Sequence, residues 1–105
     1  MGILKNNPSE DKNILTENGF KYTRSSATGA LQNCYERAIT LDCSYVMWVA
    51  VKTDTSEVYI YVEYDCGGEI ASYNCQLDNT FDDENAFFNE LDELITERAK
   101  HYNNI

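Results

Sequence analysis

The chain has 105 residues, with 18 acidic and 8 basic side chains and a formal net charge of -10. This length fits one domain, and we assign residues 9–105 to it and residues 1–8 to a flexible arm. The negative charge argues against direct binding to nucleic-acid phosphates or to an anionic membrane, because both attract lysine and arginine. A hydrophobic share of 43% excludes a disordered acidic tail.

The charge is concentrated in the second half of the chain. Residues 1–52 contain six basic and five acidic side chains, whereas residues 53–105 contain two basic and thirteen acidic ones. No base occurs between Asp54 and Glu97. Met1–Lys5 has no apolar run of the signal-peptide kind, and no later stretch is long enough for a membrane span, so a cytoplasmic location is expected.

The four cysteines, Cys34, Cys43, Cys66 and Cys75, contain no C-x-x-C pair, and His101 is the one histidine. We therefore expect no structural zinc, and we expect reduced cysteines that act as small buried hydrophobes. Residues 78–84 are rich in side-chain oxygens but lack the glycine and the terminal glutamate spacing of an EF-hand loop. Helix capping explains them better than calcium does, so no metal and no cofactor is expected.

The sequence contains no recognisable catalytic motif. His101 falls at the end of a predicted helix with no serine or cysteine motif beside it, and no glycine-rich phosphate loop occurs. We expect a protein that is not an enzyme, with no catalytic residues.

Three elements are predicted before residue 45: a short helix over Glu10–Glu17 and strands over Phe20–Ser25 and Gln32–Leu41. Ser9 is the expected helix cap, and Gly19 ends that helix. The alternation in Gln32–Leu41 leaves open which of its faces is buried.

Three further strands are predicted over Tyr45–Lys52, Glu57–Cys66 and Glu69–Leu77. Four turn residues join the first two, and Gly67-Gly68, a signal for a two-residue primed turn, joins the last two. Pairing across the first turn places Lys52 opposite Glu57, Val49 opposite Ile60 and Trp48 opposite Tyr61. Pairing across the glycines places Val62, Ile60 and Val58 opposite Tyr73, Cys75 and Leu77. Both turns select one apolar face: Met47, Val49, Val51, Val58, Ile60, Val62, Ala71, Tyr73, Cys75 and Leu77.

A helix is predicted over Asp82–Tyr102, capped by Thr80 or Asp82. Its apolar stripe consists of Phe87, Phe88, Leu91, Leu94, Ile95, Ala99 and Tyr102. The expected fold class is α+β: an antiparallel β-meander of three to five strands, packed on one face by the C-terminal α-helix, with a short N-terminal helix.

The opposite sheet face is the first candidate binding surface. The same register places Trp48, Tyr59 and Tyr61 on it, with Glu63 and Asp65 beside them and Ile70, Ser72, Asn74 and Gln76 from the third strand. Aromatic side chains amid polar groups are typical of binding surfaces. Alternatively, the N-terminal helix covers this face with Ile14 and Leu15.

A second candidate is the acidic face of the C-terminal helix. Asp83, Glu90 and Glu97 recur every seven residues, with Glu93 beside them and Asp82 and Asp92 at the flanks. A row of one sign attracts a basic partner and selects against acidic competitors. Alternatively, it is a solvated face that keeps the protein in solution.

The meander with its Trp48–Val51 and Tyr59–Tyr64 segments, followed by the acidic helix Phe81–Glu90, resembles small acidic proteins of phages and mobile elements. In size, charge and layout it is similar to the anti-CRISPR inhibitors over residues 45–102. The resemblance implies carboxylates that stand in for phosphates in the basic channel of a CRISPR nuclease. It carries over no residue by motif.

The sequence is therefore consistent with two functions. The first is a non-catalytic inhibitor that occupies a basic nucleic-acid-binding groove of a nucleic-acid-binding protein or CRISPR effector, with no direct nucleic-acid or membrane contact. Its candidate residues are the acids Glu63, Asp65, Glu69, Asp82, Asp83, Glu90, Glu93 and Glu97 and the aromatics Trp48, Tyr59 and Tyr61. The alternative is a homodimeric structural or phage accessory module that associates through the Trp/Tyr sheet face or the edge strand Glu69–Leu77.

Overall fold

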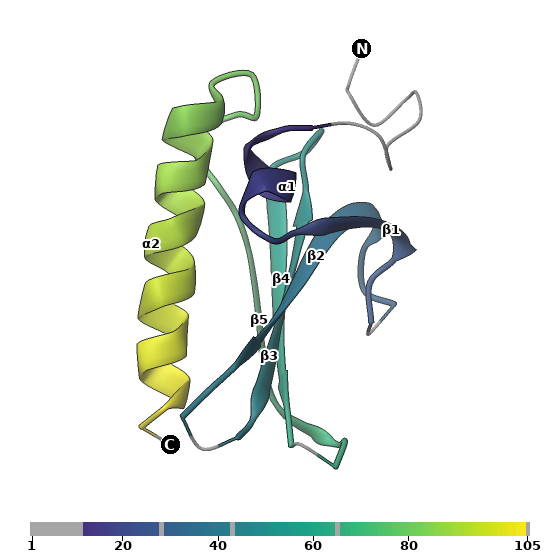
Figure 1. Cartoon of the computed structure of the whole chain (residues 1–105), viewed down its shortest axis with the longest axis vertical. Coiled ribbons are helices and arrows are strands. Elements are labelled where there is room, and N and C mark those ends of the chain that lie inside the picture. Colours follow the sequence, from purple (N-terminus) through teal and green to yellow (C-terminus); the bar gives the residue numbers. More distant parts are fainter. Residues whose placement is uncertain (1–11, 28, 43, 65, 105) are drawn as a thin grey trace.

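The computed structural model describes residues 12–27, 29–42, 44–64 and 66–104. They form a five-stranded antiparallel sheet in the order β1-β2-β3-β4-β5, with a short helix before it and a long helix after it (Figure 1). The elements are α1 (Ile14–Glu17), β1 (Lys21–Ser25), β2 (Gln32–Thr40), β3 (Val46–Lys52), β4 (Glu57–Glu63), β5 (Glu69–Gln76) and α2 (Glu84–Tyr102). The predicted α+β fold is confirmed, and the meander contains all five strands.

The hydrophobic core lies between the sheet and the helices. The predicted apolar face is buried on β3 and β4, where Met47, Val49, Val51, Val58, Ile60 and Val62 are at most 1% exposed. From α2, Phe87, Leu91, Ile95 and Tyr102 are buried in the same cluster, with Phe88, Leu94 and Ala99 half-buried against it. Burial of this apolar surface supplies the main stabilisation of the fold, and we call this side of the sheet the core face.

The β3–β4 register is as predicted. Lys52 lies opposite Glu57, Val49 opposite Ile60 and Trp48 opposite Tyr61. Alternation of side chains and the four-residue turn were sufficient to determine it.

The predicted β4–β5 pairing is wrong by two residues. Val62 lies opposite Ala71, Ile60 opposite Tyr73 and Val58 opposite Cys75. The hairpin closes on Tyr64 and Gly68, because the Tyr64 N–H donates to the Gly68 carbonyl at 3.1 Å. A two-residue shift leaves each side chain on its predicted face, so the core face is correct although the partners are not.

The irregularity between Val62 and Glu63 also changes the environment of Ile70. Ile70 was expected on the outer side of the sheet, but it packs, half-buried, against the core cluster. Since a β-bulge inserts one unpaired residue, it locally breaks the strict alternation on which the expectation depended.

Both helices begin later than predicted. Asn13, expected inside α1, is its cap and accepts from the Leu15 and Thr16 amides. Asp83, rather than Thr80 or Asp82, caps α2 through a 3.4 Å bond from the Ala86 amide. Ser9, Glu10 and the predicted arm over residues 1–8 lie outside the described residues.

The short helix α1 lies on the core face, near the start of α2 (Figure 1). Leu15 is fully buried in the core cluster, and the Ile14 amide donates to Glu84 Oε1 at 3.2 Å. The Asn13 side-chain amide donates to the Tyr35 hydroxyl at 3.1 Å. The alternative in which this helix covers the Trp/Tyr face is therefore wrong.

The position of Tyr35 also settles the ambiguous alternation of β2. Tyr35 and Ile39 pair with Val51 and Met47 on the core face, while Glu36 and Ala38 pair with Ala50 and Trp48 on the other side. Arg37, which pairs with Val49 between Tyr35 and Ile39, is nevertheless exposed and lies against Gly19, whose φ is +90°.

Candidate partner-binding surface

The side of the sheet turned away from both helices is the candidate surface, and we call it the outer face. Strand alternation and the observed register place these side chains on it: Lys21, Cys34, Glu36, Ala38, Trp48, Ala50, Lys52, Glu57, Tyr59, Tyr61, Glu63, Ser72, Asn74 and Gln76. In Figure 1, α2 runs along the opposite side of the sheet.

Three aromatic side chains form the centre of the outer face. Trp48 lies opposite Tyr61, and Tyr59 lies opposite the small side chain of Ala50. All three aromatic residues are half-buried. Such rings offer a large contact area at a small entropy cost, as binding surfaces require.

Two carboxylates lie beside these rings. The Trp48 indole N–H donates to Glu63 Oε2 at 2.9 Å, which fixes Glu63 against the ring. Glu69, at the start of β5, lies directly opposite Glu63. Like charges opposite each other across two strands destabilise a sheet.

The same neighbours raise the pKa of the Tyr61 hydroxyl above the ordinary tyrosine value. Desolvation is the largest cause, followed by the negative charges of Glu63 and Glu69. The structure thus brings together four of the predicted site residues, Trp48, Tyr61, Glu63 and Glu69, with Tyr59 adjacent. Asp65, predicted at the same hairpin, lies outside the described residues.

Glu90 of the predicted acidic row has a structural contact. Its carboxylate accepts from the Asp78 amide at 2.9 Å, the Asn79 amide at 3.0 Å and the Asn79 side-chain amide at 2.9 Å. These bonds, that from Asp78 first, lower the pKa of Glu90 below the ordinary value. Glu90 therefore holds the loop between β5 and α2.

The remaining acids of α2 and of the residues before it differ in their contacts. Asp83 caps the helix, whereas Asp82, Glu93 and Glu97 are exposed. The nearby Arg98 forms no ion pair with a described acid, and its guanidinium lies over the rings of Tyr73 and Tyr102, at 4.4 and 5.4 Å. Within the described ranges, the one ion pair joins Lys52 and Asp54, at 3.7 Å.

The two predicted groups of site residues lie in different layers. The aromatics with Glu63 and Glu69 are on the outer face, whereas Asp82, Glu93 and Glu97 belong to the helical layer that covers the core face. A flat partner surface therefore cannot contact both groups at once. The outer face combines aromatic and acidic side chains, and the α2 acids form a separate charged surface.

One corner of the outer face is covered by the connection between β1 and β2. The Ala27 amide donates to Glu36 Oε2 at 2.7 Å, and the Leu31 amide donates to Ser26 Oγ at 3.2 Å. Cys34 is fully buried, and burial raises the pKa of its thiol to about 11. The prediction of buried cysteines is confirmed for Cys34, but it is wrong for Cys66, which is exposed because β4 ends at Glu63.

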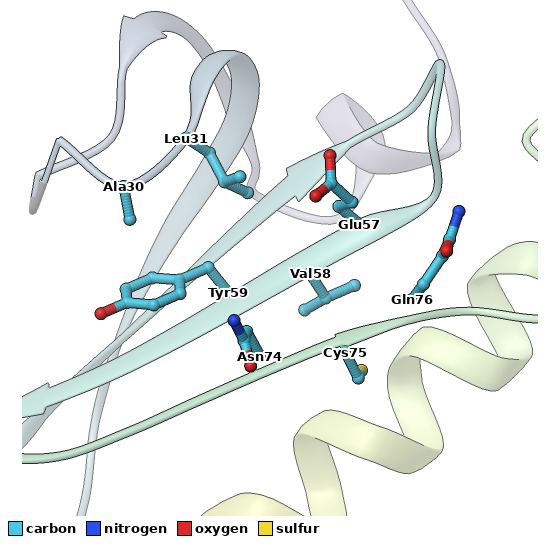
Figure 2. Close-up of a pocket in the computed structure, with 8 residues that line it drawn as sticks. All are labelled: Ala30, Leu31, Glu57, Val58, Tyr59, Asn74, Cys75 and Gln76. Atoms are coloured by element: carbon cyan, nitrogen blue, oxygen red, sulfur yellow. The ribbon is translucent and has the colours of Figure 1, made fainter.

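The same connection forms one wall of a hollow against β4 and β5 (Figure 2). Sequence reasoning did not select its residues, because the wall comes from Ala30 and Leu31, far from β4 and β5 in the chain. The alternation of β4 and β5 was the available signal, since it already placed Tyr59, Asn74 and Gln76 on one face.

In the part of the chain that the structure describes, no helix is long and apolar enough to cross a bilayer, and no group of three or more metal-ligating side chains occurs. No family model, no curated protein and no solved structure matches this chain, so its function is inferred from the outer face itself.

Proposed function

We propose that this protein is a non-catalytic acidic inhibitor that occupies the basic nucleic-acid-binding groove of a nucleic-acid-handling protein, of the CRISPR nuclease type. The observation that carries the proposal is the opposed pair Glu63 and Glu69, beside Trp48 and Tyr61, on the face that both helices leave open.

A cation from a partner would convert this unfavourable pair into a favourable one. Two carboxylates directly opposite each other repel in the free protein, and a lysine or arginine placed between them bonds to both. The adjacent Trp48 and Tyr61 rings supply apolar contact area, and a ring face also attracts a cation. The outer face thus supports a basic partner more strongly than an acidic or neutral one.

The exposed acids of α2 have a second role in this proposal. Asp82, Glu93 and Glu97 extend the negative potential beyond the docking surface. Such charges accelerate the encounter with a basic protein and make its rate depend on salt. The α2 acids steer the approach, and the outer face makes the lasting contacts.

The edge strand β5 favours a second candidate function, a homodimer. Between Glu69 and Asp78 the strand carries no charge and no proline, the usual protections of an exposed edge. A dimer through the Trp/Tyr face is less favourable, because it places the Glu63 and Glu69 carboxylates of two copies against one another. Sedimentation velocity tests the edge dimer: a concentration-dependent dimer supports it, and a monomer contradicts it.

The main proposal is tested by competition with nucleic acid. Purified CRISPR nucleases are loaded with a labelled guide or target strand in the presence of this protein, and loading is measured at low and high salt. We expect reduced loading, with inhibition that weakens as salt increases.

Matched charge reversals locate the contact. Glu69→Lys is expected to weaken inhibition by about tenfold. Glu17→Lys changes the charge equally, at an exposed position of α1 on the helical side, and should have a small effect. Equal effects of the two variants would contradict docking through the outer face. If the protein leaves nucleic-acid loading unchanged in every CRISPR nuclease tested, the assignment to this class of partner is contradicted.

A further inference from the structure

A hollow of about 380 Å³ lies on the outer face, between β4, β5 and the β1–β2 connection. In Figure 2, Ala30 and Leu31 stand on one side of it and the two strands on the other. It is lined by Ala30, Leu31, Glu57, Val58, Tyr59, Asn74, Cys75 and Gln76. Its volume is in the range of ordinary ligand sites.

The floor of the hollow is a square of four side chains. Tyr59 lies opposite Asn74, and Glu57 lies opposite Gln76. The Thr55 hydroxyl donates to Glu57 Oε1 at 2.9 Å, and the Gln76 side-chain amide donates to the Thr55 carbonyl at 2.6 Å. The side chains of Glu57 and Gln76 are therefore held in place by Thr55 in the free protein.

The carboxylate of Glu57 has no cation of its own. Lys52 is its neighbour across β3 and β4, but Lys52 Nζ donates to the Gln32 carbonyl at 3.2 Å and pairs with Asp54 at 3.7 Å. Glu57 forms no ion pair with any described residue. An unpaired carboxylate beside an aromatic ring and an apolar wall fits a cation with an apolar stem.

We propose that this hollow binds an arginine side chain of the basic partner, an inference that rests on the proposed function. The aliphatic stem packs against Leu31, the guanidinium lies over the Tyr59 ring, and its N–H groups donate to the Glu57 carboxylate and the Asn74 side-chain oxygen. Asn74 is exposed and makes no side-chain hydrogen bond to the rest of the described chain, so its oxygen is available.

Arginine fits this site better than lysine does. The guanidinium is planar, stacks on aromatic rings and donates several hydrogen bonds in fixed directions, whereas the ammonium group is a compact point charge. The protein already contains one such contact, since Arg98 lies 4.4 Å from the centre of the Tyr73 ring. The hollow offers a partner a tyrosine ring, that of Tyr59, together with the Glu57 carboxylate.

The test uses two probes of equal charge: acetylated, amidated pentapeptides with four glycines around one arginine or one lysine. Each is titrated into the ¹⁵N-labelled full chain, and amide chemical shifts are followed. We expect the largest shifts at Glu57, Tyr59 and Asn74, with binding of the arginine peptide about threefold tighter.

Three variants, with two controls, assign the contacts. Tyr59→Leu keeps an apolar side chain without the ring and should weaken arginine binding about threefold. Glu57→Gln should weaken it about twofold to fivefold, and Asn74→Ala should narrow the preference for arginine. The matched controls, Tyr64→Leu at the exposed hairpin and Glu17→Gln on α1, should leave binding unchanged.

Some results would overturn the inference. They are equal binding of the two peptides, shifts confined to α2, no saturable shifts, or equal weakening by Glu57→Gln and Glu17→Gln. Those results leave the proposed function intact if this protein still inhibits nucleic-acid loading and Glu69→Lys relieves that inhibition. If the protein prefers the arginine peptide but does not inhibit loading, the proposed class of partner is contradicted instead.

Discussion

The two faces of the sheet carry different residue types and have different environments. On the core face, β3 and β4 contribute six aliphatic side chains that are at most 1% exposed, and the two helices cover them. On the outer face, the same strands contribute half-buried aromatic rings and carboxylates. One strand alternation therefore produces a face that stabilises the fold and a face that both helices leave uncovered.

The carboxylates show the same difference. Glu90, in the helical layer, accepts three hydrogen bonds from the loop before α2, so its charge is compensated within the protein. Glu63 and Glu69, on the outer face, lie opposite each other, and Glu63 has the Trp48 indole as its donor. A compensated charge indicates a structural role, whereas Glu63 and Glu69 form no ion pair within the described residues, and our proposal of a basic partner rests on that difference.

The largest expected effect is in the core. Phe87 is fully buried, so Phe87→Ala should lower the free energy of unfolding by about 3–5 kcal/mol. Tyr61→Ala, on the outer face, should cost about 1 kcal/mol, because cross-strand pairs contribute at most that much. Chemical denaturation followed by circular dichroism measures both. Similar losses would show that the outer face is also part of the core.

The next effect separates Glu90 from its neighbours on α2. Glu90→Ala removes the acceptor of three hydrogen bonds and should cost about 1–3 kcal/mol. Glu93→Ala, one turn later at an exposed position, should change stability by less than about 0.5 kcal/mol. Equal effects would contradict the structural role of Glu90.

The dependence of the free energy of unfolding on pH also tests the structural role of Glu90. Since the pKa of Glu90 is lowered in the folded protein, its contribution is fully present above the ordinary glutamate value of 4.5 and is lost as the pH falls through the lowered pKa. Glu90→Gln should therefore show a weaker loss of stability in acid than the wild type does. If the variant and the wild type lose stability equally in acid, the Glu90 carboxylate does not contribute to the pH dependence of stability.

The sequence was sufficient for the fold because local and long-range signals agreed. The β3–β4 register followed from strand alternation and the Lys52–Glu57 pair. The β4–β5 pairing differs because the sequence predicts Gly67 and Gly68, with φ of +94° and +98°, as the two turn residues, whereas the hairpin closes on Tyr64 and Gly68. The predicted face is correct for the described residues of β3, β4 and β5 except Ile70, since the shift was even and only the bulge broke the alternation, while Asp65 lies outside the described residues.

The candidate site was less predictable, for a physical reason. A helical repeat places Glu90 in a row with Glu97, but only tertiary packing brings the amides of Asp78 and Asn79 to its carboxylate. Likewise, only tertiary packing brings Ala30 and Leu31, from the β1–β2 connection, to the hollow beside Tyr59. The outer-face residues and their β3–β4 partners were predictable, whereas contacts that depend on the packing of distant segments were not.

A smaller effect is expected at the hydrogen bond between Trp48 and Glu63. Trp48→Phe keeps a ring but removes the donor to Glu63, and it should cost about 1 kcal/mol. Glu63→Gln keeps an acceptor for the indole and also removes the repulsion with Glu69, so its net effect on stability should be smaller. The double variant should lose less than the sum of the two changes. Circular dichroism is the suitable readout, because Trp48 is the one tryptophan of the chain.

The smallest effect has the opposite sign, and it separates structural from binding carboxylates most directly. Glu69→Gln removes the repulsion with Glu63 and should raise the free energy of unfolding by about 0.2–1 kcal/mol. Glu57→Gln, whose carboxylate forms no ion pair with a described residue, should change the free energy of unfolding by less than about 0.5 kcal/mol. Both substitutions should weaken binding of the basic partner. Because Glu69→Gln gains stability while it loses affinity, a merely structural role of Glu69 cannot produce that pair of results, and a loss of stability in this variant would contradict the uncompensated pair.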